Sequence, residues 1–188
     1  MKECEKIARK YLNSSRLRHS AGTAVEAAKL CKIYNADPEK GFFVGMVHDI
    51  AKDIDNTKII ATARKYGLEL DKYMMKNPKI IHGPLGAKIL QIDENVNDEE
   101  ILRAVALHTV GSTDMSILDK IIYVADLTEV NRKYKGVRTI RQISYQDLDK
   151  ALILTLNHTM MHVLKRGLAI HPDSLNAYNK LLIEETNA

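Results

Sequence analysis

The sequence predicts an all-α fold formed by a single domain, and three observations support this prediction. The 188 residues include two Phe and no Trp, and they are rich in Ala, Leu, Lys, Glu and Met, which favour helices over strands. Apolar residues recur at helical spacing between capping residues, prolines and glycines. A chain of this length also suits one domain with its own core.

Start and stop signals place the expected helices along the chain. Helices are expected over about 16–34, 38–48, 56–66, 83–90, 98–108, 116–129 and 145–165, with a last helix opening at Asp173. Asp37-Pro38 combines an N-cap with a proline in the first turn, and residues 98–100 place acids in the first turn of another helix. Residues 68–81 are expected to form a connection, because no long apolar repeat crosses them.

Composition and charge narrow the class of protein. Hydrophobic residues make up 45% of the chain and charged residues 28%, as in globular proteins. No apolar run approaches the roughly 20 residues that span a bilayer, and the N-terminus lacks the apolar core of a secretory signal, so we expect a cytoplasmic protein without a membrane partner. Cys4 and Cys31 are too few for a disulfide framework and are expected to be reduced.

The net charge of +4 is only mildly basic. It favours an anionic small molecule at least as well as a nucleic acid, so nucleic acid is not the expected partner. The sequence does not determine the oligomeric state and leaves a homodimer open.

The dipeptide His48-Asp49 is the first candidate for a site of chemistry, because it offers an imidazole and a carboxylate to one divalent cation. Four further polar residues lie in apolar helical surroundings: His19, His82, His108 and Asp126. A single histidine in such a place is more often a core residue with a hydrogen-bond partner than a ligand. Asp126 follows five largely apolar residues, 121–125, and a buried carboxylate needs a cation or several donors.

His19, His48, Asp49 and Asp126 together form a plausible metal-ligand set. Two neutral imidazoles and two carboxylates suit iron, manganese, zinc, cobalt or nickel, and the set lacks the thiolates of a closed structural zinc site. We therefore expect these four side chains to converge on one divalent cation.

The chain resembles the HD-domain phosphohydrolases, a family named after its H…HD…D metal signature. Its segments Arg18-His19-Ser20, His48-Asp49-Ile50-Ala51-Lys52, Ile81-His82-Gly83, His108-Thr109-Val110-Gly111, Ala125-Asp126-Leu127, Arg132 and Ile170-His171-Pro172 resemble the bacterial YqeK-type branch over about residues 16–180. The resemblance implies a helical bundle, iron as the metal, and cleavage of diadenosine tetraphosphate in its middle to two ADP. It also implies one HD domain over 1–188, with the metal-site core at about 16–130 and C-terminal helices at about 144–186.

The residues around the metal set can be given roles in such a reaction. A bound metal lowers the pKa of water from 15.7 towards roughly 7, and cations near the site stabilise the negative charge that develops on phosphate oxygens. We expect Asp49, Lys52, His82 and His108 to be catalytic. Substrate contacts are expected from His19, Lys52, His82, His108, Thr109, Asp126, Arg132 and His171.

Alternatives remain for His82, His108 and His171. The first two are expected to contact phosphate or transfer protons, but they could ligate a second metal ion, or each could simply bond a backbone carbonyl. His171 is expected either to line the nucleotide pocket or to cap the helix near Pro172.

Residues 131–141 carry five positive charges and no acid. Arg132 is the best candidate for phosphate binding, because its planar guanidinium suits two oxygens at once, whereas Lys133 and Lys135 are expected to face solvent. A solvated loop or a nucleic-acid patch is the alternative reading.

The sequence also contains a partial signal for a metalloprotease. His158 and His162 have the spacing of a metalloprotease helix, but Thr159 stands where the general-base glutamate is needed. The remaining rivals are another HD-type activity, such as a nucleotidase or a cyclic-nucleotide phosphodiesterase, and a non-catalytic nucleotide- or RNA-binding protein.

Overall fold

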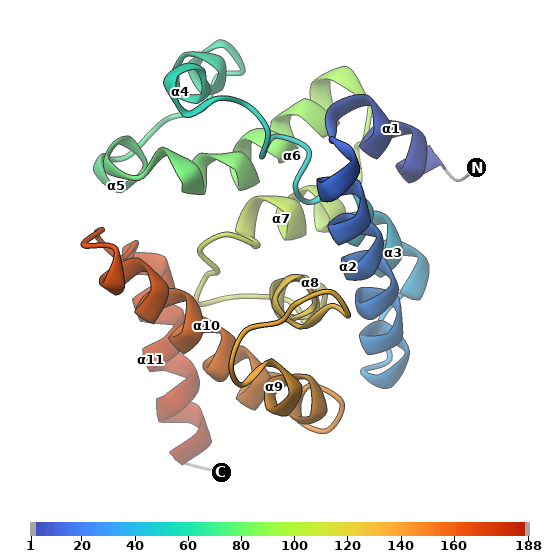
Figure 1. Cartoon of the computed structure of the whole chain (residues 1–188), viewed down its shortest axis with the longest axis vertical. Coiled ribbons are helices and arrows are strands. Elements are labelled where there is room, and N and C mark those ends of the chain that lie inside the picture. The colour runs from blue at the N-terminus through green and yellow to red at the C-terminus, as the bar shows by residue number, and fades with distance from the viewer. Residues whose placement is uncertain (1–2, 187–188) are drawn as a thin grey trace.

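The computed structural model describes residues 3–186, and every regular element among them is a helix (Figure 1). The elements are α1 (Glu3–Tyr11), α2 (Ser14–Ile33), α3 (Pro38–Val47), α4 (Asn56–Lys65), α5 (Lys72–Lys76), the 3-10 helix η1 (Pro78–Ile81), α6 (His82–Asp93), α7 (Glu99–Leu107), α8 (Ile117–Thr128), α9 (Val137–Ile143), α10 (Leu148–Lys165) and α11 (Pro172–Thr186). The all-α prediction is confirmed. The ends of the predicted domain, 1–2 and 187–188, lie outside the described residues.

Short polar side chains begin most of the helices. The residues that accept backbone N–H bonds at helix starts are Asn13, Asp37, Asp55, Asp71, Asp98, Ser116 and Asp147. They satisfy N–H groups that have no partner within the helix. The cap of α2 is Asn13, and Ser14 and Ser15 lie in its first turn.

Four short helical segments were not expected from the sequence. α1 buries only Cys4, Ile7 and Ala8, so its apolar face is too brief to stand out from its charged residues. Helices α5 and η1 occupy the stretch that was predicted to be a connection; α5 has five residues and buries none of them. α9 lies within the basic segment and buries Val137 and Ile140.

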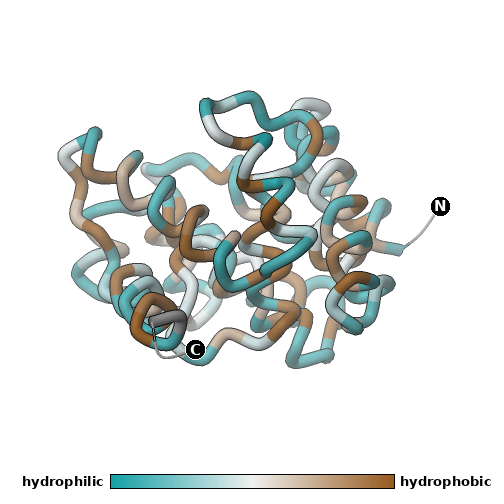
Figure 2. The backbone as a smooth tube through the Cα atoms, turned by 90° about the horizontal axis from the view of Figure 1, so that it is seen from below, coloured by the Kyte–Doolittle hydropathy of each residue, from teal (hydrophilic) through white to brown (hydrophobic). Residues whose placement is uncertain are grey.

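Helix α8 is the centre of the bundle (Figure 1). It packs against α2, α3, α7, α9 and α10, and its Ile121, Ile122, Val124 and Ala125 have no exposed surface. A helix that is apolar on nearly every side belongs in the interior. Elsewhere apolar and polar residues alternate along the chain (Figure 2), as expected for helices with one face in the core. No helix in the described part of the chain is both long enough and apolar enough to cross a membrane.

Helices α2 and α3 pack unusually closely, and this brings the first two parts of the metal signature together. A Cβ atom on Gly45 of α3 would lie 2.4 Å from the Cα atom of Ala24 in α2. Only glycine permits this approach of the two backbones. It places His48 and Asp49, at the end of α3, beside His19 of α2.

Replacing Gly45 by alanine is expected to lower the free energy of unfolding by about 1–3 kcal/mol, because the backbones must separate to admit the methyl group. Gly86→Ala is the matched control, since its new Cβ would lie at an ordinary 3.4 Å from Val105 and alanine favours a helix. Urea unfolding of both variants tests this. Equal stabilities would show that the α2–α3 contact tolerates the extra volume.

Candidate metal centre

Six side chains from five segments converge at one end of α8. His19 comes from α2, His48 and Asp49 from the end of α3, His82 from the start of α6, His108 from the end of α7, and Asp126 from the last turns of α8. The structure thus brings together all four predicted metal ligands and both additional histidines. His48, Asp49, His82 and His108 are each at most 4% exposed.

The four predicted ligands form one half of the centre. His19 Nε2 lies 2.8 Å from Asp126 Oδ1 and 3.9 Å from Asp49 Oδ2. His48 Nε2 lies 3.7 Å from Asp126 Oδ1 and 3.8 Å from Asp49 Oδ2. His19, His48 and Asp126 each offer a ligand atom within 4.8 Å of the others, and Asp49 Oδ2 lies within 3.9 Å of both imidazoles, so the four side chains are close enough to share one ion.

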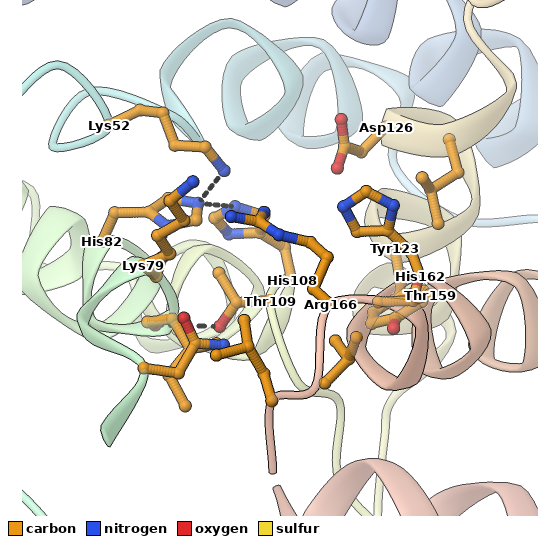
Figure 3. A pocket seen from close by; sticks show the side chains of 15 residues that line it. Lys52, Lys79, His82, His108, Thr109, Tyr123, Asp126, Thr159, His162 and Arg166 are labelled. Atoms are coloured by element: carbon orange, nitrogen blue, oxygen red, sulfur yellow. Dashed lines mark hydrogen bonds between the residues drawn. The ribbon is translucent and has the colours of Figure 1, made fainter. Parts of the chain in front are cut away.

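The other oxygen of Asp49 belongs to the second half of the centre. Asp49 Oδ1 lies 3.1 Å from His82 Nε2 and 3.5 Å from His108 Nε2, and the two histidine nitrogens are 3.0 Å apart. Lys52 Nζ is 2.9 Å from His82 Nε2 (Figure 3). A single carboxylate therefore faces two separate pairs of imidazoles.

The Nδ1 atoms show which nitrogen of each ring carries the proton. Those of His48, His82 and His108 lie 2.8, 2.5 and 2.7 Å from the carbonyl oxygens of Gly45, Lys79 and Val105, three residues earlier in each case. A carbonyl only accepts, so each Nδ1 donates. Burial lowers the pKa of His82 and of His108, so their Nε2 atoms present lone pairs to the centre. Burial also opposes a charge on His48, but Asp49 and Asp126 outweigh it and raise the pKa of His48. The alternative for His82 and His108, a bond to a backbone carbonyl, describes one nitrogen of each ring, and the other nitrogen faces Asp49 Oδ1.

Two features of these lone pairs require a positive charge. His48 Nε2 is buried without a hydrogen-bond partner. The lone pairs of His82 and His108 face one another and Asp49 Oδ1 at hydrogen-bond distance, which is repulsive unless a cation lies among them. The donor set therefore fits divalent transition ions held by nitrogen and oxygen ligands.

Asp49 and Asp126 are ionised, as ligands of a divalent ion must be. Burial opposes a charge on Asp49, but His48, His108, His82 and Lys52 outweigh it and hold the pKa of its carboxyl well below the usual range. His19, His48 and Arg132 do the same for the pKa of Asp126.

The imidazoles on the other side of Asp49 stay neutral. Burial, with the charge of Lys52, lowers the pKa of His82 to about 4, and burial also lowers that of His108. Ionised carboxylates and neutral imidazoles are the protonation states that bind metals.

Two arginines lie beside the carboxylates of the centre, on the same side as His19. Arg132 donates from Nε to the Asp126 carbonyl at 2.7 Å and from a terminal nitrogen to Asp126 Oδ1 at 2.5 Å. A terminal nitrogen of Arg16 lies 3.6 Å from Asp49 Oδ2. Arg132 was predicted to bind phosphate; it adjoins the centre and bonds a ligand carboxylate. Arg141 donates to the Thr128 and Glu129 carbonyls, so part of the basic segment is bound internally.

Glu129 is a site residue that sequence reasoning missed. Its side chain is 2% exposed, its Oε1 lies 3.2 Å from His19 Nδ1, and its Oε2 accepts from the backbone and side-chain N–H groups of Asn131. It gives His19 the Nδ1 partner that backbone carbonyls give the other three histidines. Gly22 makes the room, because a Cβ there would lie 2.4 Å from Glu129 Oε2. No sequence motif marked Glu129; its position one turn after Asp126 was the only signal.

A pocket of about 330 Å³, called the inner pocket here, opens beside His82, His108 and Asp126. Figure 3 shows the charged ends of Lys52, Lys79 and Arg166 gathered around the histidine pair, with Asp126 across the opening. Lys79, His162 and Arg166 were not predicted as site residues. The same pocket is also lined by the apolar side chains of Tyr123, Leu127, Val163 and Leu168.

Thr109 and the pair His158 and His162 have contacts that differ from those suggested by the sequence. Thr109 lines the inner pocket, but its hydroxyl donates to the Ile80 carbonyl at 3.2 Å. His158 stacks on Tyr134 while His162 lines the pocket, so this pair does not face one ion.

His171 does not line the inner pocket. Its Nδ1 accepts from the Asp173 N–H at 3.3 Å and its Nε2 pairs with Asp71 at 2.8 Å, so its contacts are those of the capping alternative. Lys133 and Lys135 are exposed, as expected.

Comparison with known proteins agrees with this geometry. The HD domain model matches residues 16–131, which include all six converging side chains. The chain belongs to the HD-domain family. This family implies a divalent metal, and the four imidazoles and two carboxylates are suitable ligands for one.

Similar members of the HD-domain family carry a specific name. The chain is 34% identical over 179 residues to the symmetrical bis(5'-nucleosyl)-tetraphosphatase of Halalkalibacterium halodurans, covering 95% of both proteins. It is 34% identical over 177 residues to the protein of the same name from Bacillus subtilis, covering 93% of both. A crystal structure of a predicted HD superfamily hydrolase involved in NAD metabolism from Clostridium acetobutylicum matches with a TM-score of 0.92 and 35% identity, over 97% of this chain and 96% of that one.

Glu129→Gln is expected to weaken metal binding by about tenfold or more, because the partners that orient a metal-bound histidine typically account for 10–100-fold in affinity. Competition with a chelator measures this directly. Glu26→Gln is the matched control: Glu26 is also buried, but it bonds Tyr145 away from the centre. An unchanged affinity in Glu129→Gln would mean that His19 is oriented without it.

Proposed function

We propose that this protein is a metal-dependent hydrolase that cleaves diadenosine tetraphosphate symmetrically to two ADP. The observation that carries the proposal is the pairing of an HD metal centre with an inner pocket whose wall gathers three cationic side chains beside an apolar surface. Close relatives over nearly the whole chain are named for this reaction. A polyphosphate needs the cations, and an adenosine needs the apolar surface.

The metal would be held by His19, His48, Asp49 and Asp126, and iron is the ion we propose. Such an ion supplies a water that ionises near neutral pH and a Lewis acid for a phosphoryl oxygen. We infer a second ion at His82, His108 and Asp49 Oδ1, because the two facing lone pairs otherwise have only Lys52 as a partner. Asp49 would then belong to both ligand sets, because its two oxygens face different imidazoles.

The remaining side chains act on the phosphates. Lys52, Lys79 and Arg166 surround the position beside the histidine pair, and among the described residues neither Lys79 nor Arg166 has an acidic partner. Their charges are therefore available to the negative oxygens that develop as a bridging P–O bond breaks. Lys52 here donates to His82 Nε2 and would transfer this hydrogen bond to a phosphate oxygen once an ion takes the histidine.

The products of diadenosine tetraphosphate test the proposed reaction. The purified, iron-loaded protein is expected to release only ADP, which chromatography resolves from AMP and ATP. Release of AMP with ATP would exclude symmetrical cleavage. Turnover of mononucleotides or cyclic nucleotides in preference to the dinucleotide would instead support another HD-type activity.

Metal content tests the ligand assignment independently of turnover. Protein isolated without chelators is expected to contain two ions per chain, of which iron is the most abundant. His82→Ala should retain one, because only the second set is broken, and Asp49→Ala should lose both. His158→Ala is the matched control, since His158 stacks on Tyr134 outside the centre. One ion in the wild-type protein and in His82→Ala would mean that Lys52 alone neutralises the histidine pair.

A further inference from the structure

A second hollow borders the metal centre at His19 and shares no lining residue with the inner pocket. It has a volume of about 740 Å³, and we call it the outer groove; it is bordered by Arg16, Arg18, His19, Asn131, Arg132 and Lys133. His19 is its point of contact with the centre, whereas His82 and His108 line the inner pocket. Each hollow therefore adjoins the centre through different side chains.

The outer groove carries four cations arranged in two layers. Arg16 and Arg132 form the inner layer and contact the ligand carboxylates Asp49 and Asp126. Arg18 and Lys133 form the outer layer, are exposed, and have no hydrogen-bond or ion-pair partner in the described part of the chain. Positive charge thus continues outward from the centre, as a chain of phosphates would require.

The acids of the outer groove do not cancel this charge. Glu129 is buried and bonded to Asn131 and His19, so it faces the protein interior. Asp53 accepts from the side chain of Asn13 at 2.7 Å and pairs with Arg16. Neither acid contacts Arg18 or Lys133. The outer cations remain free for an anion.

The two hollows differ in chemistry. The inner pocket includes five apolar or aromatic side chains, which suit a base. Every residue that lines the outer groove is polar or charged, so it suits phosphates and a ribose and provides no surface on which a base could be buried.

We propose that the outer groove is a second nucleotide subsite, which binds the diphosphate and ribose of one ADP half without contacting its base. This rests on the proposed function, because only cleavage in the middle of the tetraphosphate places one ADP on each side of the metal. The inner pocket holds the other half and recognises its adenine. A chemically symmetrical substrate is thus bound by two unlike subsites.

Binding of ADP to the metal-loaded protein tests the subsite without relying on turnover. Isothermal titration is expected to give two ADP per chain with different affinities. The double variant Arg18→Ala/Lys133→Ala should weaken one of the two sites by about tenfold or more, since each side chain offers charged hydrogen bonds to phosphate. Its melting temperature should match that of the wild type, because both residues are exposed and unpaired.

Lys135→Ala is the matched control, because Lys135 is an exposed lysine of the same segment that does not line the groove. It should leave both ADP sites unchanged. One ADP per chain in the wild type, or identical binding by the double variant, would overturn the proposal. Two ADP sites without cleavage of diadenosine tetraphosphate would instead retain the subsite and reject the proposed reaction.

Mixed dinucleotides give a second readout. Replacing one adenine of the substrate by uracil should change kcat/KM by less than about threefold, because the altered half can occupy the outer groove; replacing both should lower it by about tenfold or more, as expected when an apolar base contact is lost. A loss of about tenfold from one replacement, with a further loss from the second, would show that both bases are recognised and would overturn the base-free groove.

Discussion

The structure depends on the burial of one carboxylate, that of Asp49, whose two oxygens face different pairs of imidazoles. Asp49 is 3% exposed, and a charge removed from water to this extent is unfavourable unless partners surround it. His48 is its neighbour in sequence, but His19, His82 and His108 come from three other helices. Stabilising this single group therefore requires α2, α3, α6 and α7 to meet at one place.

Two of the histidines that surround Asp49 also bond backbone carbonyls at the ends of helices. His48 and His108 occupy the first position after α3 and α7, where carbonyls of the last turn lack helical partners. The Nδ1–H of each ring bonds one of these carbonyls and thereby turns Nε2 towards Asp49. The same contact ends the helix and selects the tautomer. Only His19, inside a long helix, needs a side chain for this purpose, and Glu129 is that side chain.

The metal ligands could be predicted from the sequence because their signal is local and chemical. His48-Asp49 is contiguous, and Asp126 is conspicuous as a carboxylate in an apolar helix. His19 joined them as a second imidazole in apolar helical surroundings, and the resemblance to HD-domain proteins agreed with the set. Which nitrogen each histidine presents, and that Asp49 has a different partner set for each oxygen, depend on tertiary contacts that no local pattern encodes.

The residues and helices that the sequence did not predict have no such local signal. Lys79, Arg166 and Glu129 look in the sequence like ordinary charges on a solvated surface, and only the packing of distant helices places them at the centre. Helix α9 was hidden for a related reason: it has two buried apolar residues among several charges, so its periodicity is too weak to detect. Residues that become neighbours only when distant helices pack together cannot be recognised from their spacing in the sequence.

The arginines beside the centre show how a strongly charged substrate can be accommodated without a large net charge. Arg132 is anchored through Nε to a backbone carbonyl, while its terminal nitrogen bonds Asp126. The Asp126 carboxylate would help to hold a bound ion, and the guanidinium would then be available to donate to an incoming phosphate. Arg16 is placed to make the same exchange with Asp49. Binding then redistributes partners among charges that are already paired, which avoids leaving any of them buried alone.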